Sequence, residues 1–281
     1  MIQLNKNFVD IFENTQIKPQ LVHNITNYVT VNDCANILLA MGSSPIMADD
    51  IEEVEEITTI CSALVLNIGT LNSRTVESMI AAGKKANELG HPVILDPVGA
   101  GASKFRTETT YQLLKEVKFA VIRGNISEIK TVYAGAGTTK GVDADVNDEV
   151  TDETLDTTVT LAKELAERAG AVIAVTGAMD LIADAGKAYV VKNGHHDMSK
   201  ITGTGCMLSA MTAAYVAANP EKALEAVVCA VASMGIAGEL ASRQVTNNQL
   251  GTGSIRTFII DNISTMTGKT IETYAKITLI P

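Results

Sequence analysis

Ala63-Leu-Val-Leu-Asn-Ile68 is a short apolar run, typical of a strand that is buried on both faces. The segment 72–89 that follows has helical periodicity, and Gly90 with His91-Pro92 after it predicts the end of that helix. One face of the helix is expected to pack on the strand, and it consists of Val76, Met79, Ile80, Gly83, Ala86 and Leu89. A strand followed by such a helix is the beginning of a βαβ unit.

The next segments repeat this pattern. Val93-Ile-Leu-Asp96 predicts a second strand, 105–118 predicts a second helix, and 119–122 predicts a third strand. Consecutive βαβ units form parallel strands with right-handed crossovers. The sequence therefore predicts an α/β fold with a mostly parallel central sheet and helices on both of its faces. Function is expected at the carboxyl ends of the strands, where ligands bind in such sheets.

The second half of the chain continues the alternation of helices and strands. Residues 151–168 predict a helix and 171–175 predict a strand. The runs 181–184 and 187–192 predict an antiparallel pair at the edge of the sheet. The polar, glycine-rich stretch 135–149 predicts a surface loop.

Two segments rich in small and apolar residues, 204–217 and 221–242, predict consecutive buried helices. The uncharged stretch 201–220 is long enough for a membrane span, but its polar residues and glycines favour a loop followed by a buried helix. Neither a break in composition nor an internal repeat divides the chain, so we expect a single domain over 1–281.

The composition is that of a globular protein with a large core, because 46% of residues are hydrophobic and 19% are charged. The formal net charge of -10 argues against nucleic acid and anionic membranes as partners. The four cysteines form no C-x-x-C pair, which favours reduced thiols over a zinc module. Residues 1–10 lack the basic start and apolar core of a signal peptide, so a cytoplasmic location is expected.

The strongest local motif is Thr202-Gly-Thr-Gly-Cys206, a glycine-rich turn that leads directly into a helix. Glycine allows backbone amides to approach a ligand, and a first helical turn offers unpaired N–H groups. Such a turn can bind an anion, although its glycines could equally serve only a tight connection. Cys206 could accept a proton or attack an electrophile at this helix start, or it could be a small core residue.

Polar residues follow several of the predicted strands. Asp96 comes at the end of one strand, where a carboxylate suits Mg²⁺ or a proton, although an Asp before proline is also a common turn cap. Arg123 and Glu128 lie around the next strand-to-helix turn and suit a polyphosphate and a metal-bound water, or else a surface charge and a helix cap. Thr176-Gly177 follows the strand 171–175. Together these motifs favour one phosphate-handling site.

Other patterns are excluded as functional motifs. Gly268-Lys269-Thr270 lacks the earlier glycine of a P-loop, and Gly99-x-Gly101 lacks the third glycine of a dinucleotide fingerprint. His195-His196 is predicted to lie in a hairpin turn beside Asn193-Gly194, where paired histidines are more often solvated than metal-bound.

In this order, the motifs resemble the ribokinase-like superfamily, and specifically the hydroxyethylthiazole kinase family of thiamine salvage. The resemblance covers nearly the whole chain and is carried by His23-Asn-Ile-Thr-Asn-Tyr28, Ser44-Pro-Ile-Met-Ala48, Asn67-Ile-Gly-Thr70, Leu95-Asp-Pro-Val-Gly-Ala-Gly101, Ile122-Arg-Gly-Asn125 with Glu128, Val175-Thr-Gly177 and Thr202-Gly-Thr-Gly-Cys206. It implies a kinase that uses ATP and Mg²⁺ to phosphorylate the hydroxyethyl group of 5-(2-hydroxyethyl)-4-methylthiazole.

The resemblance also implies roles for particular residues. Met47 and Gly203 would contact the thiazole alcohol, with Asn27 as a further neighbour. Arg123 and Thr176 would bind ATP.

The same resemblance implies that Asp96 and Glu128 organise Mg²⁺ and that the protein is a homotrimer with active sites between subunits. One position differs from the wider superfamily, in which the glycine-rich loop ends in an aspartate base. Here Cys206 stands at that position, as in the thiazole-kinase branch. A dedicated strong base is therefore not expected.

Phosphoryl transfer depends mainly on positioning and charge neutralisation, so a weak base can suffice. Our hypothesis is that the substrate hydroxyl lies near Cys206 and attacks the γ-phosphoryl group in line. The backbone amides of Gly203, Thr204, Gly205 and Cys206 would stabilise the developing negative charge, and Arg123 with Mg²⁺ would neutralise the rest.

Three other interpretations stay open at this stage. The fold also occurs in hydroxymethylpyrimidine kinases and in ADP-dependent dehydratases that repair hydrated nicotinamide cofactors. The dehydratases have an aspartate in the loop, so Cys206 argues against them. A vitamin-precursor binding protein would keep the pocket without the phosphate site, and the presence of Asp96, Arg123 and Glu128 argues against that alternative.

Overall fold

The computed structural model describes residues 2–135 and 150–280, and its centre is a nine-stranded sheet with the order β2-β1-β3-β4-β5-β6-β7-β8-β9. Neighbouring strands from β2 to β6 are parallel, and those from β6 to β9 are antiparallel. The strands are β1 (Leu21–Ile25), β2 (Ser44–Ile46), β3 (Ala63–Asn67), β4 (Val93–Asp96), β5 (Val121–Gly124), β6 (Val172–Val175), β7 (Asp180–Ala183), β8 (Ala188–Val191) and β9 (Ile277–Ile280).

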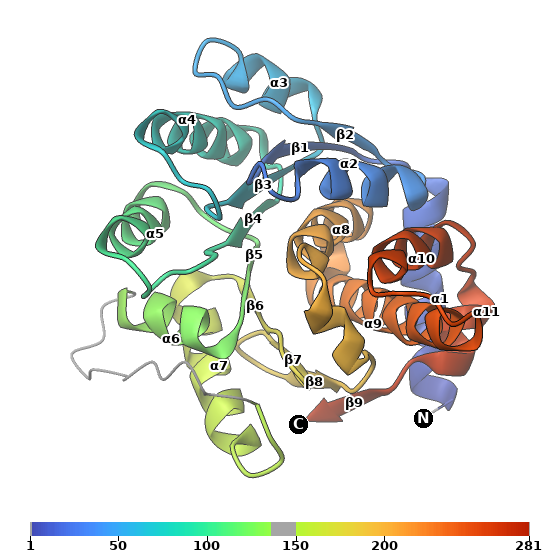
Figure 1. The fold of residues 1–281 in the computed structure, drawn as a ribbon. Coiled ribbons are helices and arrows are strands. Elements are labelled where there is room, and N and C mark those ends of the chain that lie inside the picture. The colour runs from blue at the N-terminus through green and yellow to red at the C-terminus, as the bar shows by residue number, and fades with distance from the viewer. Residues whose placement is uncertain (1, 136–149, 281) are drawn as a thin grey trace.

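Helices cover both faces of this sheet, so the expected three-layer arrangement is confirmed (Figure 1). One layer contains α1 (Ile2–Ile17), α2 (Val31–Ala40), α8 (Thr204–Ala218), α9 (Ala223–Asn247), α10 (Gly253–Ser264) and α11 (Gly268–Tyr274). The other layer contains α3 (Val54–Ile60), α4 (Ser73–Leu89), α5 (Lys104–Glu116), α6 (Ile126–Gly135) and α7 (Leu155–Ala169).

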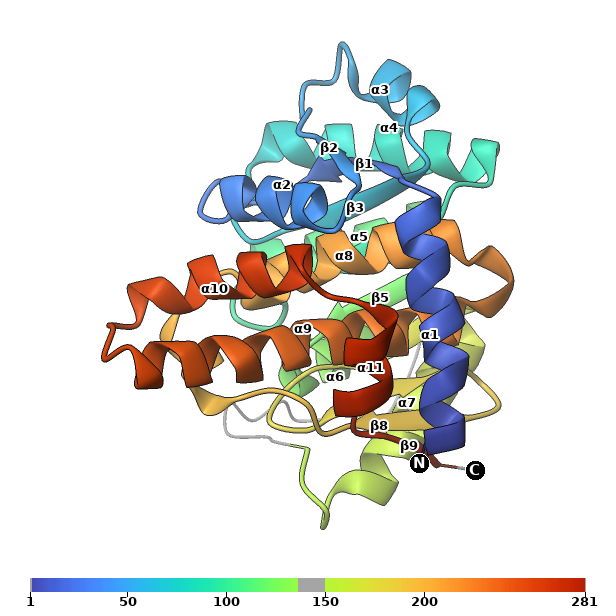
Figure 2. The same cartoon turned by 90° about the vertical axis from the view of Figure 1, so that its right-hand side faces the viewer.

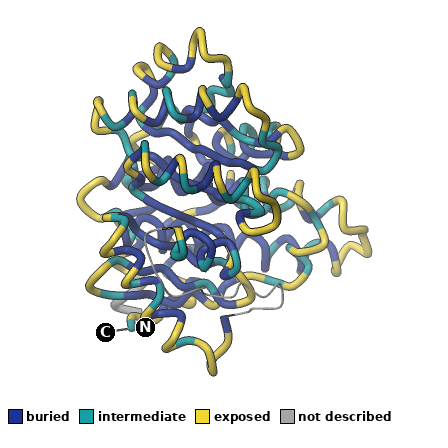
Figure 3. Tube along the Cα trace, turned by 90° about the vertical axis from the view of Figure 1, so that its left-hand side faces the viewer, coloured by how far each residue is buried: buried dark blue, intermediate teal, exposed yellow. Residues whose placement is uncertain are grey.

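Strand β3 is buried on both faces of the sheet, which explains why its residues 63–66 are an uninterrupted apolar run. Successive side chains of a strand point to opposite faces, so Ala63 and Val65 enter one core layer while Leu64 and Leu66 enter the other. All four residues are at most 1% exposed. Figure 3 shows the same burial along the central strands, between helices whose outer turns are exposed.

Helix α4 begins and ends where its sequence predicts. Asn72 accepts a hydrogen bond from the backbone N–H of Thr75, whose side chain completes a capping box, and Gly90 ends the helix in the left-handed conformation. Val76 and Met79 on the predicted face are buried. For Leu89 the prediction was wrong: this last residue of the helix, next to the Gly90 cap, is exposed.

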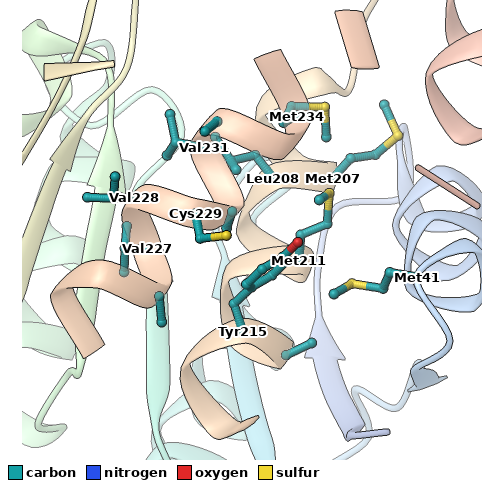
Figure 4. Packing of buried hydrophobic residues seen from close by; sticks show 14 of the residues in the cluster. Met41, Met207, Leu208, Met211, Tyr215, Val227, Val228, Cys229, Val231 and Met234 are labelled. Carbon is teal, nitrogen blue, oxygen red and sulfur yellow. The ribbon is translucent and has the colours of Figure 1, made fainter. Parts of the chain in front are cut away.

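The predicted small-residue helices are α8 and α9, which pack against each other in the middle of one layer (Figures 2 and 4). Tyr215 of α8 is 1% exposed, and its hydroxyl lies 3.0 Å from the hydroxyl of Ser233 on α9. Within the described residues, Pro220–Asn247 is the one helix with the length and hydropathy of a membrane span. However, 83% of its apolar 18-residue stretch is buried inside the protein.

Several predicted boundaries need correction. The strand predicted at 119–122 lies at Val121–Gly124, because it pairs with β6 over these residues, and Arg123 is therefore inside the strand. The helix predicted from Thr151 begins at Leu155, after a turn in which Thr154 N donates to Thr151 O.

The predicted hairpin β7–β8 is present, but it does not lie at the sheet edge, because β9 pairs with β8 and forms that edge. Of the predicted loop 135–149, Gly135 ends α6, and 136–149 lie outside the described residues. The prediction for His195-His196 was also wrong: β8 leads into a short 3-10 helix, His196–Lys200, and not into a hairpin.

Candidate active site

At the carboxyl ends of β3, β4 and β5, two side chains from strands and one from α8 surround the buried carboxylate of Asp96. Oδ2 of Asp96 accepts hydrogen bonds from Asn67 Nδ2 at 2.7 Å and from Ser209 Oγ at 2.8 Å. Arg123 Nη1 lies 3.4 Å from the same oxygen. Asp96 is 0% exposed and Arg123 is 7% exposed, so this ion pair lies inside the protein.

The ion pair leaves two polar atoms without a partner. In the part of the chain that the structure describes, Oδ1 of Asp96 and Nε of Arg123 are buried and make no hydrogen bond. Buried polar atoms nearly always have a partner, and leaving one unpaired costs roughly 1–3 kcal/mol. The two atoms therefore mark a position where a ligand, an ion or water belongs.

The N-terminus of α8 lies directly over the guanidinium group. A Cβ atom at Gly205 would lie 2.6 Å from both Nη1 and Nη2 of Arg123, so only glycine allows this approach. Gly203 has a left-handed φ of 95°, which glycine adopts without strain. Because the Met207 N–H donates to the Gly203 carbonyl at 2.8 Å, the N–H groups of Thr204, Gly205 and Cys206 belong to the first turn.

Cys206 is held by two amide groups. Asn27 Nδ2 donates to its Sγ at 3.2 Å and Asn67 Nδ2 at 3.4 Å. Asn27 is itself fixed, since its Oδ1 accepts from the N–H and the hydroxyl of Thr30. The sulfur therefore accepts hydrogen bonds from both amides, which fix its position at the start of α8.

Glu128 combines a buried position with a capping role. Its Oε1 accepts from Gly99 N and its Oε2 from Asn125 N, each at 2.8 Å, while Glu128 N donates to Asn125 Oδ1. The helix-cap interpretation from the sequence is thus confirmed. The pKa of Glu128 is raised, mainly by burial and to a smaller extent by the nearby charge of Asp96.

Two cavities flank the start of α8. The smaller has a volume of about 310 Å³ and includes Tyr28, Met47 and Asn67 in its lining. The larger has a volume of about 610 Å³ and includes Thr176 and Asp180, the first-turn residues Thr204 and Gly205, and the segment from Asn193 to Ser199 except Asp197. Asn67 of the smaller cavity donates to Cys206, the residue after Gly205 of the larger cavity, so the start of α8 lies between the two spaces.

The model of the hydroxyethylthiazole kinase family matches residues 12–269. The chain belongs to this family. A curated hydroxyethylthiazole kinase of Clostridium acetobutylicum is 61% identical over 264 residues, which cover 94% of this chain and 96% of the relative. Members of the hydroxyethylthiazole kinase family are kinases that act on an alcohol group.

Solved structures agree with this assignment. A hydroxyethylthiazole kinase protein from Pyrococcus horikoshii OT3 has a TM-score of 0.87 and 36% identity, and the match covers 98% of this chain and 100% of that one. A ribokinase-like superfamily protein from Enterococcus faecalis V583 has a TM-score of 0.59 and 12% identity, and the match covers 92% of this chain and 94% of that one. The second likeness shows the fold alone, and the expected ribokinase-like architecture is confirmed.

Within this hydroxyethylthiazole kinase fold, two residues of the buried cluster were not predicted as site residues. Asn67 is the last residue of β3, so its position at a strand end was a usable signal. Ser209 lies one helical turn after Cys206, and this spacing places both on the side of α8 that faces β3 and β4. The sequence alone did not show that Ser209 donates to Asp96.

Asp180 is a third residue that the sequence analysis missed. It lines the larger cavity at the start of β7, and its Oδ1 accepts from Gly177 N at 2.9 Å. Burial raises the pKa of Asp180 to about 7, although the Gly177 N–H and the charge of Arg123 act in the opposite direction. The signal available was a carboxylate just after the Thr176-Gly177 motif.

This raised pKa gives a stability prediction. Between the unfolded pKa near 4 and the folded pKa of about 7, the folded state of Asp180 binds more protons, so stability falls as pH rises through this window. Asp180→Asn should therefore stabilise the protein at pH 8 by on the order of 2 kcal/mol, less than the full linkage value because the side chain is partly exposed. At pH 5 the gain should be much smaller. Thermal unfolding at both pH values measures the difference, and an equal gain at both would contradict it.

Proposed function

We propose that the protein transfers the γ-phosphoryl group of ATP to the hydroxyethyl oxygen of 5-(2-hydroxyethyl)-4-methylthiazole, in thiamine salvage or biosynthesis. The observation that carries the proposal is the first turn of α8 between two cavities, with Arg123 and Asp96 buried beside it. A donor and an acceptor in these cavities would meet at a helix N-terminus, which favours negative charge.

The larger cavity is proposed as the ATP site. Thr204 and Gly205 would direct their backbone N–H groups at the phosphates of ATP. The guanidinium group of Arg123, which packs against Gly205, would bind the same phosphates. Thr176 lines the same cavity, and its N–H donates to Gly124 O at 2.8 Å, so its hydroxyl is held at the end of β6. The separate cavity on the other side leaves room for a second substrate, as a transferase requires.

The smaller cavity is proposed as the site of the thiazole alcohol. Met47 lines it and offers a flexible apolar surface for a small heterocycle. Gly203 and Asn27 would contact the hydroxyethyl arm. A Cβ atom at Gly203 would lie 3.0 Å from Thr30 Cγ2, which supports a backbone-only contact at this position.

The residues present also fit Mg²⁺, a hard cation that binds carboxylates and water. Among the described residues, Oδ1 of Asp96 is buried and has no hydrogen-bond partner, and Glu128 adds a second carboxylate nearby. Both oxygens of Glu128 already accept from backbone N–H groups, which supports contact through water for this residue. When bound, the ion would neutralise charge on the transferring group.

The hydroxyl proton is proposed to pass to the thiolate form of Cys206, which becomes the thiol as the acceptor oxygen attacks. Amides of Asn27 and Asn67 hold the sulfur, and the first-turn N–H groups of α8 lie next to it. Arg123 would stabilise the charge that develops on the phosphoryl oxygens. In this scheme Cys206 supplies only a weak base, and positioning does most of the work.

Substitutions at Cys206 test its role as a proton acceptor. Cys206→Ala should lower kcat by about a hundredfold, the low end for general-base removal. Cys206→Asp should retain or raise kcat, because a carboxylate can accept the same proton. Phosphorylated product is measured at saturating ATP, and an Ala variant as active as wild type would remove the base from the mechanism.

The assembly and location of the protein belong to the proposal as well. Tyr28 is 79% exposed although it lines the smaller cavity, and Val29 beside it is 57% exposed. An apolar rim of this kind supports a homotrimer in which a second subunit completes the acceptor site. We further propose a single catalytic domain over 1–281, a cytoplasmic location, and neither nucleic acid nor membrane as a partner.

The substrate is tested by following ADP production from ATP with 5-(2-hydroxyethyl)-4-methylthiazole, with hydroxymethylpyrimidine, and without an alcohol. The proposal predicts turnover that depends on the thiazole alcohol. A preference for hydroxymethylpyrimidine would identify the related kinase, and ADP binding without alcohol-dependent turnover would indicate a binding protein.

A further inference from the structure

A second buried polar network lies at the far side of the larger cavity, centred on Glu239 of α9. This residue is 8% exposed. Its Oε1 accepts from Asn193 Nδ2 at 3.1 Å, from Gly194 N at 3.0 Å and from Lys276 Nζ at 2.9 Å. One carboxylate oxygen therefore joins α9, the segment after β8 and the residue before β9.

Asn193 is held from the other side as well. Its Nδ2 also donates to Tyr274 O at 2.9 Å, and its Oδ1 accepts from Lys276 N at 2.7 Å. Asn193 is 4% exposed, so these contacts are shielded from water. The chain at Asn193 and Gly194 is thus fixed both by α9 and by the segment from Tyr274 to Lys276 that precedes β9.

The surface of α9 next to Glu239 is shaped for this segment. A Cβ atom at Gly235 would lie 2.6 Å from Cβ of Asn193, and one at Gly238 would lie 2.2 Å from Sδ of Met198. A side chain at Gly235 would collide with the backbone of Asn193, and one at Gly238 would displace the side chain of Met198. Gly235, and one turn later Gly238 with Glu239, hold the chain from Asn193 to Met198 against α9.

This held segment forms part of the wall of the larger cavity, which the first turn of α8 also lines. Asn193, Gly194, His195 and Met198 all line that cavity. Thr204 and Gly205 occupy the phosphate end, so the wall faces the part of a nucleotide that lies beyond the phosphates. Met198 offers apolar surface and His195 a flat ring, which suit the base and ribose.

We propose that Glu239 is a positioning residue for nucleotide binding: it holds the 193–198 wall in the shape that accepts the nucleoside part of ATP. This inference rests on the proposed kinase function for the identity of the ligand. Glu239 is not expected to touch ATP or the reacting atoms. Its removal should change nucleotide affinity and leave the chemical step intact.

The ionised form of Glu239 is the one that performs this task. Burial raises the pKa of Glu239, but hydrogen bonds from Lys276, Gly194 and Asn193 outweigh burial, and the net shift is downward. A carboxylate can accept all three bonds at once, whereas an amide at the same position presents an NH₂ group to some of the same donors.

Glu225 provides a matched control on the same helix. It accepts from Lys187 Nζ and from Tyr189 Oη, so it also ties α9 to strand β8. These three residues line neither of the two cavities. If carboxylates on α9 served only to hold helix and sheet together, Glu225→Gln and Glu239→Gln would have the same consequences.

The test compares Glu239→Gln and Glu225→Gln with wild type for KM of ATP, KM of the thiazole alcohol, kcat, Tm and Kd of ADP by calorimetry. For Glu239→Gln we expect KM of ATP and Kd of ADP to rise about tenfold, the cost of one charge-assisted contact, with kcat and the KM of the alcohol within about twofold. Glu225→Gln should lower Tm without changing nucleotide affinity.

Unchanged Kd of ADP in Glu239→Gln, or an equal rise in Glu225→Gln, would overturn the inference. Wild-type protein that binds ADP without alcohol-dependent turnover would refute the proposed function, while the ADP measurement would still test Glu239. Lys276→Met provides a second variant if Glu239→Gln does not fold, because it removes one donor and should raise Kd of ADP in the same direction.

Discussion

Asp96→Asn is expected to lower kcat by on the order of a thousandfold while the protein stays folded. The carboxylate Oδ2 accepts from Asn67 and Ser209 and lies beside Arg123, so an amide NH₂ at this position would face donors and weaken the cluster. Oδ1, which has no hydrogen-bond partner among the described residues and which we propose as a contact for Mg²⁺, would also lose its charge. Steady-state rates of alcohol-dependent ADP release measure the effect.

Ser209→Ala is the matched control for this substitution. It removes one hydrogen bond to Asp96 Oδ2 but keeps the carboxylate and its pairing with Arg123. Its loss should be about tenfold or less, the cost of one hydrogen bond. A Ser209→Ala loss as large as that of Asp96→Asn would mean that packing around the cluster, and not the charge of Asp96, limits the reaction.

Arg123→Ala should have the second large effect, a fall in kcat/KM for ATP of about a thousandfold, as for other arginines that stabilise phosphoryl transfer. The substitution removes the guanidinium that packs under Gly205 and leaves Asp96 buried without its cation. The variant should therefore also unfold at a lower temperature, because breaking a buried pair costs roughly 3–5 kcal/mol.

Arg123→Lys separates charge from geometry. Lysine keeps the positive charge but cannot present two nitrogens to the first turn of α8, so partial activity with a raised KM for ATP is expected. If Arg123→Ala leaves the ATP dependence unchanged while the enzyme stays folded, Arg123 does not bind ATP and its assignment is wrong.

The parallel core of the fold could be predicted because its signals are local. The run 63–68 is apolar at nearly every position, since β3 is covered on both faces, and Asn72 and Gly90 delimit α4 through contacts within a few residues. Buried strands linked by amphipathic helices leave few possible topologies.

The edge of the sheet could not be predicted in the same way. Strand β9 lies at the C-terminus, far in sequence from its partner β8, and its two middle residues are exposed. Lys276, the residue before β9, donates hydrogen bonds to Asn193 and Glu239, which are distant in sequence. No local pattern reveals such contacts, so the pairing of β9 with β8 could not be predicted. Similarly, α7 begins at Leu155 after a turn between Thr151 and Thr154, and the sequence pattern does not mark this boundary.

In the candidate site, residues at strand ends could be predicted from the sequence. Residues that reach the site from within a helix, or that only hold a segment lining it, could not. Asp96, Arg123 and the first turn of α8 lie at positions where α/β folds bind ligands. Ser209 joins the cluster from inside a helix, and Glu239 acts on the larger cavity from the opposite side of the 193–198 wall. Such roles arise only when distant segments pack together.

The most direct test of phosphoryl transfer at the start of α8 is the fate of the γ-phosphoryl group. Phosphorus NMR of ATP and 5-(2-hydroxyethyl)-4-methylthiazole with wild type and with Asp96→Asn would follow it. We predict one phosphate ester of the thiazole alcohol for each ADP with wild type, and almost none with the variant over the same time. ADP with inorganic phosphate in place of the ester, or equal ester formation by Asp96→Asn, would contradict the account.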